Sequence, residues 1–191
     1  MNPKAGLTFF LNEHNDLYVS YARATKEPNR SDYKSYYEAL QDDPNAKKPI
    51  AEKLNDIELG WRLTTPKVRL NLNGYYMGYE DQLVLSGKLN STGYPIRENV
   101  GKSYRAGVEA DAMVKLSERW FWSPNLAFSK NLNRDYKSQD ADVATRTISW
   151  GDTRISYSPD VVLGNTITFM PIDGFQIGLI SKYVGAQYVD N

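Results

Sequence analysis

The sequence predicts an all-β protein, an antiparallel, up-and-down transmembrane β-barrel segment with about eight strands of a larger barrel. Three observations predict this fold. Strand-length segments alternate apolar and polar residues, very short turns alternate with long polar connections, and aromatic residues gather near strand ends. These features are typical of strands that cross a bilayer with one face toward lipid and the other toward a polar interior.

Two segments show the alternation most clearly. In residues 67–77 and 103–115, apolar side chains recur at every second position and form one face of a strand. The apolar positions are Val68, Leu70, Leu72, Tyr76, Tyr104, Ala106, Val108, Ala110, Ala112 and Val114. The opposite face of 67–77 is polar and that of 103–115 is strongly charged, which indicates a wall between lipid and a polar lumen rather than one side of a soluble sheet.

The expected strands follow one another along the chain. They cover about 3–11, 17–25, 53–63, 67–77, 102–115, 120–129 and 160–170, and the last begins at Phe175. Residues 35–41 can form a short helix inside the first long connection, and residues 147–157 can add further strand. The segment at 160–170 is less regular, because Asn165 lies among apolar residues.

The connections between strands are of two kinds, and these alternate. Short turns lie at 12–16, 64–66, 116–119 and 171–174, and long polar loops lie at 26–52, 87–99 and 130–159. A membrane barrel has short periplasmic turns and long extracellular loops in this order. We therefore expect the long loops outside the cell and the short turns in the periplasm.

Tryptophan residues lie close to the short turns. Trp120 and Trp122 begin a strand directly after a short turn, and Trp61 lies near the end of a strand before one. Amphipathic rings at these positions are typical of an interfacial girdle. Because aromatic residues are enriched in every β-sheet, a plain sheet remains the other interpretation.

Charge and composition exclude several function classes. Lys plus Arg and Asp plus Glu number 23 each, so the chain lacks the basic excess of a nucleic-acid-binding protein. The absence of cysteine excludes disulfides and thiolate metal sites. No apolar run approaches about 18 residues, which excludes a transmembrane helix.

The sequence predicts no enzymatic site. His14, the one histidine, lies in the first short turn without the further ligands of a metal site or the partners of a catalytic triad. The acidic run at 135–142 lacks the spacing of a calcium loop. We therefore expect no catalytic residue, no metal site, no cofactor and no enzyme activity.

Several stretches of the chain resemble TonB-dependent outer-membrane receptors. They are 19–30 (VSYARATKEPNR), 53–60 (KLNDIELG), 73–77 (NGYYM), 79–84 (YEDQLV), 99–109 (NVGKSYRAGVE), 158–160 (SPD) and 182–188 (KYVGAQY). They cover nearly the whole chain in order, and they are most similar to receptors of Bacteroidetes-type bacteria.

The resemblance implies an energy-coupled importer of a scarce nutrient, such as an iron–siderophore complex, haem or cobalamin, in the outer membrane of a Gram-negative bacterium. In this family a barrel of about twenty-two strands encloses a plug domain. The implied partners are outer-membrane lipid, a plug domain, the TonB energy-coupling protein and a small-molecule or metal-chelate ligand. We expect residues 1–191 to be one partial barrel domain from the C-terminal half of the barrel, with the plug domain and closing strands absent.

Inward charges and loop tyrosines are the candidate functional residues. In a complete receptor the inward charges would line the wall that faces the plug, as plain lumen polarity or as ligand contacts. These charges are Asp56, Glu58, Arg62, Arg69, Arg105, Glu109 and Asp111. The loop tyrosines that could contact a ligand from outside are Tyr33, Tyr36, Tyr37, Tyr94 and Tyr136.

A second hypothesis is a self-contained soluble or surface β-domain that acts as a binding module. About eight strands can close into a small barrel or form a sandwich. The two hypotheses differ in what the apolar face touches, which is lipid in a receptor wall and the protein's own core in a soluble domain.

Overall fold

The computed structural model describes residues 2–42, 44, 46–89, 93, 95–139 and 147–189, and most of these residues lie in one antiparallel sheet. The strands are β1 (Lys4–Asn12), β2 (Asn15–Lys26), β3 (Glu52–Thr64), β4 (Val68–Leu89), β5 (Pro95–Lys115), β6 (Trp120–Gln139), β7 (Thr147–Arg154), β8 (Val161–Ile172) and β9 (Phe175–Val184). Within these residues the one helix is α1 (Arg30–Asp42), which is neither long nor apolar enough to cross a membrane. The sheet order follows the chain from β1 to β9, with β7 as an additional partner of β6. The predicted all-β, up-and-down fold is confirmed.

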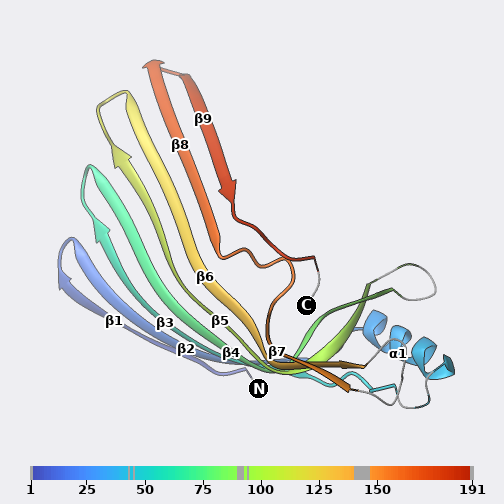
Figure 1. Ribbon diagram of the computed structural model, residues 1–191. Helices are drawn as coiled ribbons and strands as arrows, with labels where there is room; N and C mark the ends of the chain where they lie inside the picture. The colour runs from blue at the N-terminus through green and yellow to red at the C-terminus, as the bar shows by residue number, and fades with distance from the viewer. Residues whose placement is uncertain are drawn as a thin grey trace.

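The sheet is a curved layer whose two ends carry different connections (Figure 1). Tight turns join β1 to β2, β3 to β4, β5 to β6 and β8 to β9, all at one end, which we call the short-turn end. The far ends of β4, β5, β6 and β7 lie with α1 at the opposite end, which we call the long-connection end. The predicted short turns are confirmed and lie together at one end, and the side of the membrane that each end faces stays a prediction.

The strand register places the expected apolar residues on one face. One row across the sheet consists of Leu17, Trp61, Leu72, Ala110, Leu126 and Leu163, each directly opposite the next. The neighbouring row contains Leu59, Val108 and Phe128, whose side chains are 61%, 46% and 51% exposed. We call this face the outward face. A continuous, exposed apolar face is the surface that a barrel wall presents to lipid.

Three strands are longer than the sequence predicts. β4 and β5 continue to pair from Gln82 opposite Val100 to Leu89 opposite Pro95, within the loop expected at 87–99. β6 runs to Gln139 and pairs with β7 within the loop expected at 130–159. The predicted boundaries of both loops are therefore wrong. In this part of the sheet the consecutive residues Gln82, Leu83 and Val84 are all buried, so the strand lacks the alternation of apolar and polar residues that marks a wall with one lipid face.

A bend crosses β4, β5 and β6 at one level of the sheet. Asp81 and Asp135 have positive φ angles of 55° and 47°, and Gly101 lies between them in the register. Positive φ is unfavourable for most residues other than glycine, although aspartate tolerates it better than most. Beyond this row β4 and β5 run toward α1 (Figure 1). We call the sheet between the short turns and this row the wall, and the part beyond it, with α1, the platform.

Most buried apolar residues of the described chain lie in the platform, and the exception is Ile155, in the connection between β7 and β8. Val84, Val100 and Tyr136 form a buried cluster beyond the bend. In the wall, the outward apolar residues have no second layer over them, and β1 and β9 are open edges of the described sheet. A soluble sandwich or closed barrel would bury this face. The described sheet therefore lacks the closed or two-layered form of a self-contained soluble β-domain.

Aromatic side chains form the expected group at the short-turn end of the outward face. Trp120 stacks on Phe169 with ring centroids 4.3 Å apart. The Trp122 indole N–H donates to Asn165 Oδ1 (2.6 Å). Rings with an apolar body and a satisfied N–H suit a membrane interface. Asn165 interrupts the apolar pattern of β8 in the sequence. In the structure it accepts the hydrogen bond of the Trp122 indole N–H, which would otherwise lack a partner in the protein.

Val108→Arg places a charge in the middle of the outward face, and we expect it to reduce assembly of the full-length protein in membranes. An arginine at the midplane of a lipid-facing strand costs roughly 2–4 kcal/mol. The measurement is the fraction of folded, heat-modifiable barrel in isolated membranes. Glu109→Arg, one residue further and on the opposite face, is the matched control and should assemble normally. Equal loss in both variants would contradict the assignment of the two faces.

Candidate functional site on the polar face of the wall

All seven inward charges predicted from the sequence lie on the polar face of the wall. The register fixes this face, which is opposite to the one that carries Leu72 and Val108. Asp56, Glu58 and Arg62 belong to β3, Arg69 belongs to β4, and Arg105, Glu109 and Asp111 belong to β5. The register places all seven on one face of the sheet, and their exposure to a lumen and their contact with a plug or a ligand stay predictions.

A polar ladder crosses four strands near the short-turn end. Arg62 Nε donates to Asp16 Oδ1 (2.7 Å), and its guanidinium lies over the Tyr18 ring, 5.0 Å from the centroid. Arg62 is opposite Asn71, whose Nδ2 donates to Asp111 Oδ1 (3.1 Å). These contacts hold Arg62 and Asp111 in fixed orientations, although the two side chains do not pair with each other.

Two tyrosine rings lie over glycines of the neighbouring strand. Tyr18 is directly opposite Gly60, where a Cβ would lie 2.1 Å from the Tyr18 ring. Tyr75 is directly opposite Gly107, where a Cβ would lie 2.9 Å from the Tyr75 ring. The rings therefore occupy the space in which a second side chain would stand. Only glycine allows an aromatic ring to approach the neighbouring strand so closely.

Residues 155–160, which connect β7 to β8, cross the polar face. Arg105 Nη1 donates to Ser158 Oγ (3.0 Å), so this connector is tied to β5. The connector and the wall line an open pocket of about 310 Å³, which also includes Glu58 and Glu109. The pocket presents charges of both signs to the lumen side.

Asp56 and Arg69 are the remaining inward charges, and their surroundings differ. Asp56 and Arg105 lie in one row on either side of Met77. The Oδ1 atom of Asp56 is buried and lacks a hydrogen-bond partner among the described residues. Arg69 is exposed and lies opposite Met113. Because an unsatisfied buried oxygen is unfavourable, Asp56 is the wall carboxylate that gains most from a further partner.

Three of the predicted loop tyrosines, Tyr33, Tyr36 and Tyr37, lie on α1. The helix begins after Asn29, whose Oδ1 accepts hydrogen bonds from the backbone N–H groups of Ser31 (2.7 Å) and Asp32 (3.0 Å), as an N-cap does. Tyr37 is 61% exposed, and its ring centroid lies 5.2 Å from that of Tyr36. The helix therefore presents aromatic surface at the long-connection end.

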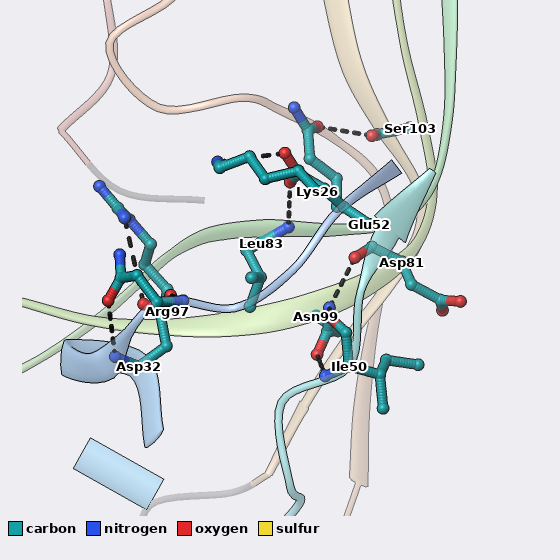
Figure 2. A network of polar contacts seen from close by, with 11 residues as sticks. Lys26, Asp32, Ile50, Glu52, Asp81, Leu83, Arg97, Asn99 and Ser103 are labelled. Carbon is teal, nitrogen blue, oxygen red and sulfur yellow. Dashed lines mark hydrogen bonds and ion pairs between the residues drawn. The ribbon is translucent and has the colours of Figure 1, made fainter. Parts of the chain in front are cut away.

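A polar network fastens the segment that carries α1 to the β4–β5 hairpin (Figure 2). Glu52 accepts hydrogen bonds from Lys26 Nζ (3.2 Å) and from the backbone N–H of Leu83 (3.0 Å). Asn99 bonds both backbone groups of Ile50, at 2.9 and 3.0 Å. The platform is thus one connected unit of helix, hairpin and loop.

Tyr136 does not lie in a loop. It belongs to β6, is 8% exposed and packs with Val84 and Val100. Its predicted loop position is wrong because β6 continues into the platform. Tyr94 lies outside the described residues. Ligand contact by any of these tyrosines stays a prediction.

Several polar-face residues were not predicted as functional candidates. Tyr18, Asn71, Asn73 and Tyr75 share the rows of the inward charges, and Tyr18 OH donates to Asn73 Oδ1 (3.0 Å). Each lies an even number of residues from another inward-facing polar residue of its own strand. Residues so spaced share one face of a strand, and this spacing could have identified them as polar-face residues. Ser158 had no such signal, because its bond to Arg105 depends on the path of the connector.

His14 lies exposed in the turn between β1 and β2, at the short-turn end. Across the described ranges, no three His, Cys, Asp or Glu side chains are placed to hold a metal ion. The polar face, with its fixed charged rows and its pocket, is therefore the candidate functional site.

This geometry defines a class of protein, a segment of membrane β-barrel wall with one face for lipid and one polar face for a lumen. The family model for the TonB-dependent receptor-like β-barrel matches residues 1–191. The chain belongs to the TonB-dependent receptor β-barrel family and is an outer-membrane protein. No curated protein sequence matches it.

Solved receptor structures share this fold. The ferric yersiniabactin uptake receptor of Yersinia pestis is 19% identical, with a TM-score of 0.69 over 98% of this chain and 26% of that chain. The ferric-catecholate import receptor Fiu of E. coli K12 is 18% identical, with a TM-score of 0.67 over 96% and 24%. A copper transporter, OprC, is 17% identical, with a TM-score of 0.70 over 95% and 25%. The chain thus spans about a quarter of the length of these proteins, and the similarity shows the fold.

Gly107→Ala should destabilise the wall. The new Cβ would lie 2.6 Å from the carbonyl oxygen of Phe128, a backbone atom that cannot rotate away, and overpacking of this kind costs about 1–3 kcal/mol. We expect the purified full-length protein to unfold at a lower temperature. Gly101→Ala, in the same strand, is the control, because nothing lies within 4 Å of its Cβ position. The interpretation fails if both variants unfold at the same temperature.

Proposed function

We propose that this chain forms part of the wall of a TonB-dependent receptor that imports a scarce nutrient, such as an iron–siderophore complex, haem, cobalamin or a similar compound. One observation carries the proposal, a family match over residues 1–191 that coincides with a wall whose polar face is built of ordered charged rows. The receptors with similar folds are named as importers of ferric siderophores or as a copper transporter, which supports nutrient uptake as the class of function.

The proposed mechanism is ligand capture and gated passage, without chemical catalysis. The outward face meets lipid, and the polar face meets a plug domain that the TonB protein would pull on. Contacts such as Arg62 with Asp16 and Asn71 with Asp111 hold the polar face in one arrangement, so a plug would rest on an ordered surface. The unsatisfied oxygen of Asp56 is a position where a polar group of the plug would gain a partner.

The platform supports a role in ligand capture. Asp32 Oδ1 of α1 lies 4.0 Å from Arg97 Nη1 of the β4–β5 hairpin, which connects the helix that carries exposed Tyr37 to the platform at the long-connection end. If this end is extracellular, as the connection lengths predict, Tyr37 and its neighbours are available to a ligand before the ligand reaches the lumen. Rigid aromatic side chains suit such contacts because they lose little conformational entropy.

Uptake by the whole receptor tests the proposed function. We expect deletion of the receptor gene in its own organism to abolish uptake of one radiolabelled compound in a panel of ferric siderophores, haem, cobalamin and copper chelates. Reintroducing the intact gene should restore uptake, and removal of the TonB protein should abolish it again. Uptake of every compound at the wild-type rate in the deletion strain, or import that persists without the TonB protein, would count against the proposal.

A photo-crosslinking pair tests the plug contact. Tyr75 and Tyr76 are neighbours in β4 and point to opposite faces of the sheet. A benzoylphenylalanine probe at position 75 therefore differs from a probe at position 76 only in the face toward which it points. In the full-length receptor, the probe at position 75 should crosslink to the plug, which peptide mass spectrometry detects, and the probe at 76 should crosslink to lipid. A plug crosslink from position 76, or none from 75, would overturn the assigned direction of the polar face.

A further inference from the structure

The connection between β7 and β8 interrupts what is otherwise one strand along β6 (Figure 1). β7 ends opposite Leu132, and β8 begins opposite Phe128 of the same strand. Between these two points β6 has three residues, 129–131, whereas the connector has six, 155–160. A strand with surplus residues bulges out of the ladder, and such bulges are frequent next to functional sites. The surplus length here carries the connector across the polar face to β5.

The ends of the connector are fixed to the sheet, and its middle is held by a side chain. Asn131 and Ser129 of β6 hold the two ends through hydrogen bonds to backbone atoms. In the middle, Arg105 Nη1 donates to Ser158 Oγ (3.0 Å). Tyr157, next to Ser158, has a positive φ of 53°, which is unfavourable for a residue other than glycine. The middle of the connector therefore adopts a strained conformation that the Arg105 contact stabilises.

A second acceptor for Arg105 lies in the same row of the sheet. Asp56 of β3 and Arg105 of β5 lie on the two sides of Met77 of β4. Two strand spacings separate their Cα atoms by about 10 Å, which an extended arginine and an aspartate side chain span together. Met77, which is unbranched and flexible, can move aside. Tyr79 lies close enough to both charges to interact electrostatically with each. A change of rotamer therefore brings the Arg105 guanidinium to Asp56.

The hydrogen bonds of the two acceptors balance one arrangement against the other. With Arg105 on Ser158, the buried Oδ1 atom of Asp56 has no partner among the described residues. A guanidinium–carboxylate contact would satisfy this oxygen, and it is stronger than a contact with a hydroxyl. Ser158 would still have a partner, because its hydroxyl also donates to the carbonyl oxygen of Ser156 (3.1 Å). Each arrangement thus has its own favourable contact, as a two-state element requires.

We propose that Ser158 and Asp56 compete for Arg105, and that this competition sets whether the connector rests on the wall or is released from it. Arg105 acts here as a positioning residue, because it selects the place of the connector and needs no contact with a ligand. The switch lies entirely within this chain. It therefore goes beyond the proposed import function and does not depend on which nutrient the receptor carries.

The position of the connector affects two parts of the structure. On the wall, Tyr157, Ser158 and Pro159 line one side of the pocket of about 310 Å³. Release of the connector widens this pocket. It also loosens the joint between β7, which belongs to the platform, and β8, which belongs to the wall. A single side chain thus links the pocket on the polar face to the platform.

Hydrogen exchange of the purified full-length receptor, followed by mass spectrometry on the peptide that contains 155–160, tests the proposal. The Tyr157 N–H donates to the carbonyl oxygen of Tyr188 (2.8 Å) while the connector lies on the wall, so faster exchange of this peptide reports release. Ser158→Ala removes the acceptor on the connector and should speed exchange. Asp56→Asn removes the competing acceptor and should slow exchange, although it lies on another strand of the wall. We expect the wild type to lie between the two variants, which should differ about tenfold, the effect of one hydrogen bond to a charged group.

A merely structural contact between Arg105 and Ser158 would leave Asp56→Asn at the wild-type rate, and that result, or a faster rate, would overturn the proposal. Ser158→Ala combined with Asp56→Asn should exchange as Ser158→Ala does, because the connector then offers Arg105 no acceptor to lose. Asp111→Asn, the same change further along β5 on the same face, is the matched control and should exchange as the wild type does. Slower exchange in this control would also contradict the switch. If Ser158→Ala fails to assemble, the comparison of Asp56→Asn with the wild type decides alone.

Discussion

The structure depends on one constraint, that no water is present in a bilayer core to satisfy a backbone N–H or C=O group. The wall meets this constraint by pairing strands in continuous register, from Asn15 opposite Leu63 to Ala127 opposite Val162. Once the backbone is satisfied in this way, side chains alone decide what each face touches. Because successive side chains of a strand point to opposite faces, the alternation gives the sheet one apolar face for lipid and one polar face for the lumen.

The charges of the chain are separated in space although they balance in number. On the polar face, carboxylates and arginines are interleaved, and several are held by neighbours such as Asn71. On the outward face, cations gather at one end and the middle is apolar. A net charge of zero therefore conceals two distinct electrostatic surfaces. Composition alone would suggest a protein without a charged partner, whereas the register shows where each sign is concentrated.

The wall could be predicted from sequence, whereas the short helix at 35–41, which lies within α1, was the one part of the platform that was predicted. Residues such as Leu70, Leu72 and Val108 alternate because one side is dry, and this pattern fixed both the strands and their direction. Beyond the bend consecutive residues such as Leu83 and Val84 are both buried, so apolar and polar residues do not alternate along the strand. Tyr136 was misplaced because β6 continues into the platform, where it packs with Val84 and Val100. The contact of Ser158 with Arg105 depends on tertiary path and has no local signature.

The bend at Asp81 leaves the register of the β4–β5 hairpin unchanged, because Glu80 opposite Lys102 and Gln82 opposite Val100 belong to the same alignment. Residue pairs added or lost beyond the bend would therefore lengthen or shorten the platform without shifting a single strand in the wall. The length of the platform is thus independent of the strand alignment that the wall needs in the membrane.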